Sequence, residues 1–171
     1  MPFPAELVRD FVNTYDVEAQ ADELSSPAEL AMWLRERDLI GPRDRATDDD
    51  LTTAHALREG LRASLRREAA DLPSLPLRVA VRAGEAPELV PACEGVPGGL
   101  ARIAAAAVSA SWNRLKVCAE STCQWAFIDS SKNRSRSWCS MRVCGNRTKT
   151  RAYRARKRGS RLLVGSNTDT V

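Results

Sequence analysis

Four cysteines stand in the second half of the chain in two pairs with the same internal spacing. Four residues separate Cys118 from Cys123, fifteen residues follow, and four residues again separate Cys139 from Cys144. Two short loops that each supply two thiolates can occupy the corners of a tetrahedron around one zinc ion, with Zn–S distances of about 2.3 Å. The spacing therefore predicts a compact module, residues 112–160, in which the two pairs meet around a metal.

A set of four cysteine ligands closes the coordination sphere of zinc and leaves no position for a water molecule or a substrate. We therefore expect one structural Zn²⁺ per chain, held by Cys118, Cys123, Cys139 and Cys144. Because so small a module has little apolar core, the metal would supply most of its folding free energy, about 10–16 kcal/mol in zinc-finger peptides. Free buried cysteines and an iron–sulfur cluster remain alternatives. Cys93 lies outside the pattern and is expected to be a small apolar filler.

The flanks of the first cysteine pair are predicted to be the two arms of a β-hairpin. Val117, Trp125 and Phe127 would form its small apolar core. Aromatic side chains in such a module could instead stack on unpaired bases, and Tyr153 is the best candidate for that role.

Charge is unevenly distributed along the chain. Residues 1–111 contain 12 Lys or Arg and 19 Asp or Glu, whereas residues 112–161 contain 14 Lys or Arg and two acidic residues. A basic surface raises the local concentration and the association rate of polyanions. The distribution indicates a nucleic acid as the partner of the second half, and it does not distinguish DNA from RNA.

A basic helix is predicted to begin near Cys144. Four arginines at i, i+4, i+7 and i+11, counted from Arg147, would form one stripe that matches the path of a groove or a phosphate backbone. The loop before the second cysteine pair adds cations beside small hydroxyl residues, which suits phosphate contacts. A solvated, solubilising helix end is the alternative. The predicted nucleic-acid contacts are Lys132, Arg134, Arg136, Arg142, Arg147, Lys149, Arg151, Arg154, Arg156, Lys157 and Arg158.

Residues 1–111 are predicted to form one mostly helical domain. Apolar residues at helical spacing indicate a first helix over residues 4–17. Ser26 and Pro27 provide the N-terminal cap and a favoured first residue for a second helix. A third helix is predicted to begin after Thr47, because three aspartates in its first turn interact favourably with the helix dipole.

A short antiparallel element is predicted after the third helix. Leu77, Val79 and Val81 alternate with residues that would lie on a solvated face, and a turn at residues 84–87 would join two strands. A glycine- and proline-rich connector then leads to a helix that ends near residue 112. The expected fold class is therefore α+β: a mostly helical N-terminal domain with a small β-hairpin, then a four-cysteine zinc-finger module made of a β-hairpin and a basic helix. The predicted divisions are residues 1–111, residues 112–160 and a flexible tail of residues 161–171.

Two polar features of residues 1–111, called the front domain below, have ordinary structural interpretations. Asn13 and Thr14 interrupt an apolar helix, and we expect a polar pair that ends it rather than the lining of a pocket. His55 is the only histidine, and no cysteine stands beside it on its helix. A partly buried histidine with a hydrogen-bond partner is therefore expected.

The stretch RLKVCAESTCQWAFIDSSKNRSRSWCSMRVCGNRTKTRAYRARK resembles the CGNR zinc finger, which is named for the tetrapeptide Cys144-Gly145-Asn146-Arg147. The resemblance covers about residues 112–158, and every ligand position is filled. The front half, with LVRDFVNT and LSSPAELAMWL, is similar to the domain found upstream of this finger in bacterial stress-induced transcription regulators. The two resemblances imply DNA binding by the finger and a sensing role for the front domain.

Several classes of protein are not expected. The first residues lack the pattern of a secretory signal, and no window is apolar enough for a membrane span, which predicts a soluble, cytoplasmic protein. A phosphate loop, a nucleophile elbow and a paired cysteine and histidine are absent from the sequence, so an enzyme is not expected. The predicted function is a DNA-binding transcriptional regulator whose partner is double-stranded DNA. A homodimer and a small-molecule effector stay open, and the alternatives are an RNA-binding protein and an adaptor whose finger binds an acidic protein.

Overall fold

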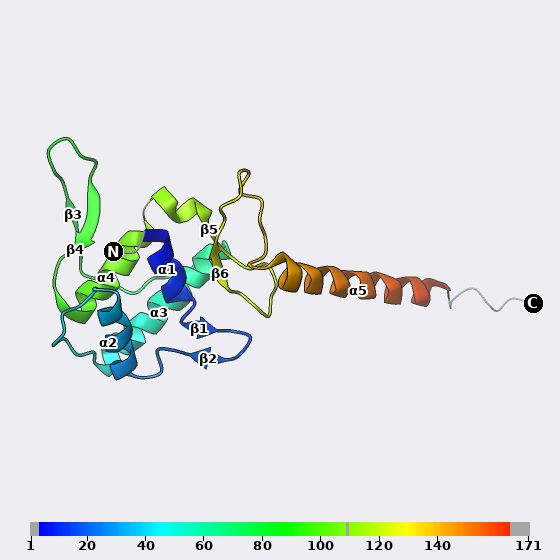
Figure 1. Cartoon of the computed structure of the whole chain (residues 1–171), viewed down its shortest axis with the longest axis horizontal. Coiled ribbons are helices and arrows are strands. Elements are labelled where there is room, and N and C mark those ends of the chain that lie inside the picture. Colours follow the sequence, from blue (N-terminus) through cyan, green and yellow to red (C-terminus); the bar gives the residue numbers. More distant parts are fainter. Residues whose placement is uncertain (1–3, 109, 165–171) are drawn as a thin grey trace, which may run out of the picture.

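A computed structural model describes residues 4–108 and 110–164 and shows a helical body from which one long helix projects (Figure 1). The body is built from four helices: α1 (Pro4–Val12), α2 (Pro27–Glu36), α3 (Asp48–Leu65) and α4 (Gly95–Ala107). Their apolar faces meet in one core, in which Phe11, Leu57 and Leu100 are almost completely buried. Together with three small antiparallel strand pairs, these helices confirm the predicted α+β class.

The starts of α2 and α3 follow the predicted local signals. Ser26 caps α2, since its Oγ accepts a hydrogen bond from the N–H of Glu29 at 3.3 Å. At α3, the Thr47 hydroxyl accepts from the N–H of Asp50, and the Asp50 carboxylate accepts from the N–H of Thr47 at 2.9 Å. These contacts satisfy N–H groups that have no partner within the helix.

The first helix is shorter than predicted. It ends at Val12 and is followed by a small hairpin of β1 (Tyr15–Asp16) and β2 (Ala21–Asp22). Arg62 of α3 donates hydrogen bonds to the carbonyls of Val12 at 2.7 Å and Tyr15 at 3.0 Å. A side chain from another helix therefore satisfies carbonyls that a further helical turn would otherwise have satisfied.

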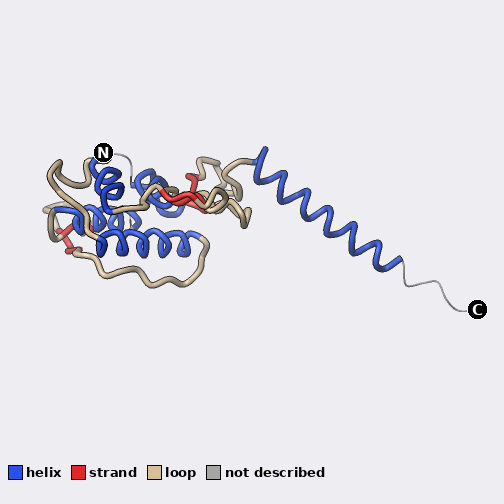
Figure 2. The backbone as a smooth tube through the Cα atoms, turned by 90° about the horizontal axis from the view of Figure 1, so that it is seen from below, coloured by secondary structure: helices blue, strands red, loops and turns tan. Residues whose placement is uncertain are grey.

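The β3–β4 hairpin has the predicted position but a different connection to the helix that follows. β3 (Leu77–Ala80) pairs with β4 (Glu88–Pro91), and the hairpin projects from the body (Figure 1). The segment between α3 and β3 runs back beside the helices as a loop (Figure 2). Helix α4 begins at Gly95, inside the predicted connector, and ends at Ala107 rather than near residue 112. One 3-10 turn, η1 (Ala110–Arg114), then leads into the finger.

The hairpin of the zinc finger packs on the helical body. β5 (Leu115–Val117) pairs with β6 (Ala126–Ile128). β6 lies against α1, and β5 lies against α3. Leu115 and Ala126 belong to the same apolar core as the four helices. The apolar core of the front domain therefore contributes to the stability of this hairpin.

The basic helix α5 (Asn146–Val164) follows one π-helical turn, η2 (Met141–Gly145), and extends away from the body (Figures 1 and 2). It includes residues 161–164, which the sequence assigned to the tail, and residues 165–171 lie outside the described residues. Over the part of the chain that the structure describes, no helix combines the length and apolar character needed to cross a membrane.

Candidate metal centre and nucleic-acid interface

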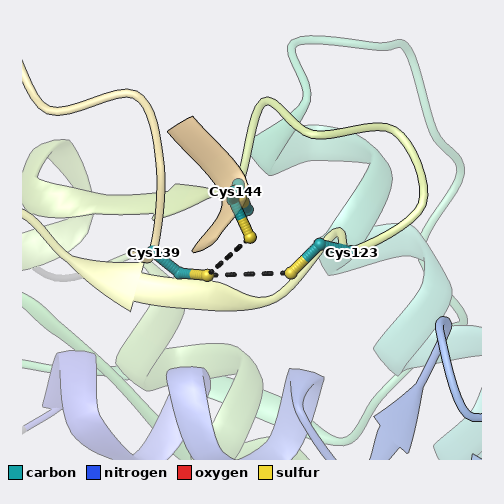
Figure 3. Close-up of side chains that lie close together, drawn as sticks. Cys123, Cys139 and Cys144 are labelled. Atoms are coloured by element: carbon teal, nitrogen blue, oxygen red, sulfur yellow. Dashed lines mark hydrogen bonds between the residues drawn. The ribbon is translucent and has the colours of Figure 1, made fainter. Parts of the chain in front are cut away.

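The four predicted metal ligands meet between the finger hairpin and the start of α5. Their Sγ atoms all lie within 4.8 Å of one another, and all four cysteines are free. The Sγ of Cys139 lies 3.6 Å from that of Cys123 and 3.7 Å from that of Cys144 (Figure 3). Sulfurs at the corners of a zinc tetrahedron are about 3.8 Å apart, whereas a disulfide bond measures about 2.0 Å. The donor set and its spacing fit one structural zinc ion held by Cys118, Cys123, Cys139 and Cys144.

Burial and neighbouring groups shift the pKa values of Cys118, Cys123 and Cys139. Burial raises the pKa of Cys123 to about 11 and also raises the pKa of Cys139. Burial would raise the pKa of Cys118 too, but hydrogen bonds from the N–H groups of Cys139 and Glu120 outweigh it, so that the pKa of Cys118 is lowered. Zinc binds thiolates, so loading of the site must release protons.

The turn η2 presents Cys144 to the metal centre. The carbonyl of Ser140 accepts hydrogen bonds from the N–H groups of Cys144 at 2.9 Å and Gly145 at 3.1 Å. The side chain of Asn146 donates to the carbonyl of Arg142 at 3.0 Å. The predicted helix near Cys144 is thus an α-helix only from Asn146 onward, because a wider turn precedes it.

Glu120 fastens α5 to the metal centre. Its side chain is buried in the turn between the first two cysteines. One carboxylate oxygen accepts a hydrogen bond from the Thr148 hydroxyl at 2.8 Å, and the other pairs with the Arg151 guanidinium at 2.9 Å. The Thr148 hydrogen bond and the Arg151 contact lower the pKa of Glu120. Glu120 was not among the predicted site residues, although it is one of only two acidic residues in residues 112–161.

The other acidic residue of that segment, Asp129, shapes the basic loop (residues 130–137). Its buried carboxylate accepts hydrogen bonds from the Lys116 ammonium at 2.7 Å, from the N–H of Ser131 at 2.9 Å and from the N–H of Arg136 at 3.0 Å. The Lys116 hydrogen bond and the contacts from the loop hold the pKa of Asp129 well below its usual range. Asp129 therefore fixes the loop on which predicted nucleic-acid contacts lie.

Cations of the basic loop differ in their surroundings. Lys132, Arg134 and Arg136 are all exposed. The Arg136 guanidinium lies 4.9 Å from the centre of the Phe127 ring, and its Nε donates to the carbonyl of Trp138 at 2.9 Å. Arg136, a predicted nucleic-acid contact, therefore also contacts the ring of Phe127 and the main chain before the second cysteine pair. Phe127 is buried as predicted, whereas Trp125, predicted to share its core, is 38% exposed.

The predicted cations of α5 fall into two groups. Arg147 pairs with Glu18 at 3.0 Å and Arg151 pairs with Glu120 at 2.9 Å. The remaining cations are exposed, and none forms an ion pair within residues 4–108 and 110–164; they are Lys149, Arg154, Arg156, Lys157 and Arg158. Arg142 before the helix is exposed as well, as is Tyr153.

The predicted arginine stripe lies on one face of α5. Its four members line a common shallow hollow along the helix, in the order Arg147, Arg151, Arg154 and Arg158. The arrangement of the stripe agrees with the sequence-based expectation, while contact of these residues with nucleic acid stays a prediction.

The front domain reaches the finger through side chains that the sequence did not identify as contacts. Asn13 donates to the carbonyl of Ala126 at 2.9 Å and accepts from its N–H at 2.7 Å. Arg62 donates to the carbonyl of Gln124 at 3.3 Å, and the guanidinium of Arg66 contacts the Gln124 side chain. The front domain and the finger are therefore joined by polar contacts as well as by a shared core.

Two minor expectations have different outcomes. His55 is partly exposed, and its Nε2 lies 2.9 Å from the carbonyl oxygen of Leu24, which agrees with a histidine that has a hydrogen-bond partner. Cys93 is exposed, so the expectation of a packed apolar filler was wrong.

Comparison with known families yields two matches that meet at the junction of η1 and β5. Residues 5–115 match the family model described as "Putative stress-induced transcription regulator". Residues 114–157 match the CGNR zinc finger, as the resemblance of the sequence had indicated. No curated protein matches the sequence.

Proposed function

We propose that this chain, which belongs to the family described as "Putative stress-induced transcription regulator" and carries a CGNR zinc finger, binds double-stranded DNA through α5 and the basic loop. Zinc, when bound, would supply the cross-link that joins the finger hairpin to the start of α5. DNA binding itself would depend on the cationic side chains of α5 and of the basic loop.

The observation that carries this proposal is the projecting helix and its unpaired cations. The sequence of α5 contains eight Lys or Arg and no Asp or Glu. Its 19 residues correspond to a length of about 28 Å. The major groove of B-DNA, about 12 Å wide, admits a helix of this kind.

The distribution of charge around α5 favours a duplex. Arg154 and Arg158 lie on one face, in the hollow described above. Arg156 lies two residues after Arg154, which places it about 200° further around the helix. Lys149, seven residues before Arg156, lies on the same side as Arg156. A helix with cations on opposite sides can approach the phosphates of both strands that border one groove.

The test is a titration of fluorescent random-sequence duplex DNA with the zinc-loaded full chain at several salt concentrations. Each phosphate contact contributes about −0.9 to the slope of log K against log salt concentration. About six contacts would thus weaken binding roughly a thousandfold between 50 and 200 mM salt. Removal of zinc by a chelator is expected to weaken this binding strongly, because the start of α5 loses its link to the finger hairpin through the metal.

Competition separates the alternatives. Matched-length duplex RNA and polyglutamate are added as competitors to the labelled DNA complex. Preferential displacement by RNA would move the function to RNA binding. Displacement by polyglutamate, with weak affinity for both nucleic acids, would favour an adaptor that binds acidic proteins.

We further propose that the front domain senses a signal and forms a homodimer, because one finger buries little surface on DNA. An apolar groove between the β3–β4 hairpin and α4 is the candidate dimer surface, and the exposed Val79 and Val108 line it. Val79→Asp should shift the molecular mass in sedimentation equilibrium from dimer to monomer. A wild-type chain that stays monomeric at micromolar concentration would exclude this arrangement.

We propose a regulatory role and no enzymatic one, since four thiolates leave zinc without an open position.

A further inference from the structure

An ion pair connects the front domain to the first turn of the basic helix. Arg147, the second residue of α5, places its Nη1 3.0 Å from Oε1 of Glu18 in the front domain. The same nitrogen lies 3.3 Å from the Thr122 hydroxyl of the finger. Arg147 is therefore occupied by protein partners, unlike the exposed Arg154 and Arg158 further along the same face of α5.

The hairpin that carries Glu18 is itself fastened to α3. Glu18 lies in the turn between β1 and β2. The buried guanidinium of Arg58 donates two hydrogen bonds to the Asp22 carboxylate of β2, at 2.6 and 2.8 Å. The guanidinium carbons of Arg58 and Arg62 lie 5.3 and 5.7 Å from the centre of the Tyr15 ring of β1. The position of Glu18 is thus determined by the body of the front domain.

The start of α5 is held from two sides. On one side, Glu120 of the finger binds Thr148 and Arg151. On the other side, Glu18 of the front domain binds Arg147. A single contact would attach the helix but leave it free to rotate about that contact. A second carboxylate on a separate element restricts this rotation, so the two contacts together determine the direction of the helix.

We propose that Arg147 is a positioning residue, and that the Glu18–Arg147 pair lets the front domain set the direction in which α5 meets DNA. This inference rests on the proposed DNA binding. The pair is partly exposed, with side-chain exposures of 35% for Arg147 and 51% for Glu18. A pair of this kind can open when the β1–β2 hairpin moves, so a signal received by the front domain would reach α5 through it.

The two possible roles of Arg147 predict different salt dependence. A residue that contacts phosphate contributes to the slope of log K against log salt concentration, whereas a residue that orients the helix changes affinity at constant slope. Arg147→Gln is therefore expected to weaken DNA binding about two- to fivefold, as for a partly exposed ion pair, without changing the slope. Arg154→Gln, on the same face but exposed, serves as the matched control and should make the slope shallower by about 0.9.

A charge exchange provides the decisive variant. Glu18→Arg combined with Arg147→Glu restores an ion pair and leaves the net charge of the chain unchanged. The double variant should recover most of the wild-type affinity, whereas Arg147→Glu alone should not. Zinc content and circular dichroism of every variant establish that it is folded.

Failure of the positioning role of Arg147 can be distinguished from failure of the proposed DNA binding. If the wild-type chain does not bind duplex DNA, the proposed function fails. If it binds, an unrestored double variant, or a slope change with Arg147→Gln equal to that with Arg154→Gln, would show that Arg147 contacts DNA and would overturn the positioning role. Energy transfer between dyes on α3 and α5, measured without DNA, gives an independent readout. It should change with Glu18→Gln and remain unchanged with Arg154→Gln.

Discussion

The side-chain amide of Asn13 forms with the main chain of Ala126 the pair of hydrogen bonds that a neighbouring strand would form. The oxygen accepts from the N–H at 2.7 Å and the nitrogen donates to the carbonyl at 2.9 Å, across a separation of 113 positions. One asparagine thus covers part of the open edge of β6 and seats the finger hairpin on α1. Exposed strand edges otherwise leave their N–H and C=O groups unpaired.

Replacement of this asparagine should destabilise the whole chain. Asn13→Ala leaves two buried main-chain groups without partners, and we expect the free energy of unfolding to fall by about 1–3 kcal/mol. Urea unfolding of the zinc-loaded chain measures the change. Asn133→Ala, in the exposed basic loop, is the control and should stay within about 0.5 kcal/mol of wild type. Equal stabilities of the two variants would contradict the structural role of Asn13.

Loss of one ligand should remove the metal. Cys144→Ser replaces a soft thiolate with a hydroxyl that binds zinc poorly, so zinc content measured by elemental analysis should fall well below one per chain. Circular dichroism should still show the front helices, while the melting temperature falls because Leu115 and Ala126 belong to the common core. Cys93→Ser, exposed and outside the cluster, should keep a full complement of zinc. Retention of zinc by Cys144→Ser would refute the four-ligand site.

Acid should weaken the attachment of the β1–β2 hairpin to α3. Burial raises the pKa of Asp22, but hydrogen bonds from Arg58 and from the N–H of Leu24 outweigh burial and lower it. A carboxyl whose folded pKa is lowered contributes its full stabilisation above its usual pKa of about 3.9 and loses it as the pH falls through the folded value.

Asp22→Asn tests that dependence. At pH 7 the variant should be less stable than wild type by about 1.5–3 kcal/mol, because the buried Arg58 loses charged hydrogen bonds. The difference should shrink as the pH falls below about 4, because Asp22 becomes protonated first in the unfolded chain and, at still lower pH, in the folded chain. Urea unfolding at pH 3 to 7 measures it, and metal release affects both chains alike. A difference that stays constant with pH would contradict the charged pair.

Removal of Glu120 should weaken DNA binding even though it makes the chain more basic. By charge alone, Glu120→Ala would strengthen binding to a polyanion. The structure predicts the opposite sign, because Thr148 and Arg151 lose the carboxylate that holds α5. Glu23→Ala, an exposed site with the same charge change, should not weaken binding. Anisotropy titrations of both variants decide the sign, and zinc analysis establishes that the metal centre is intact.

Features encoded within a few residues could be predicted from the sequence. The cysteine spacing identified four ligands because each pair sits in one short loop, and two loops suffice for a tetrahedron. The starts of α2 and α3 depend on side chains that cap N–H groups three positions away, and those side chains can be read directly. The positions of the arginines on one face of α5 follow from helical geometry alone.

Features that depend on distant partners could not be predicted. The first helix was expected to continue past Val12, but Arg62, 50 positions away, satisfies the carbonyl at its end. Arginines are seldom buried, so nothing local marked Arg58 as the partner of Asp22, 36 positions away. The contact of Glu18 with Arg147 likewise joins segments that meet only in the folded chain.

Among the described residues, the side chains that hold α5 to the rest of the molecule lie near its start, so the helix can tilt about a pivot at the metal centre. A tilt of about 10° about this pivot would move the far end of a helix about 28 Å long by about 5 Å. Successive base pairs are only about 3.4 Å apart along the duplex. Small displacements at the start of the helix can therefore move its far end by more than one base-pair spacing, so in the proposed DNA complex the metal end of α5 would decide the register.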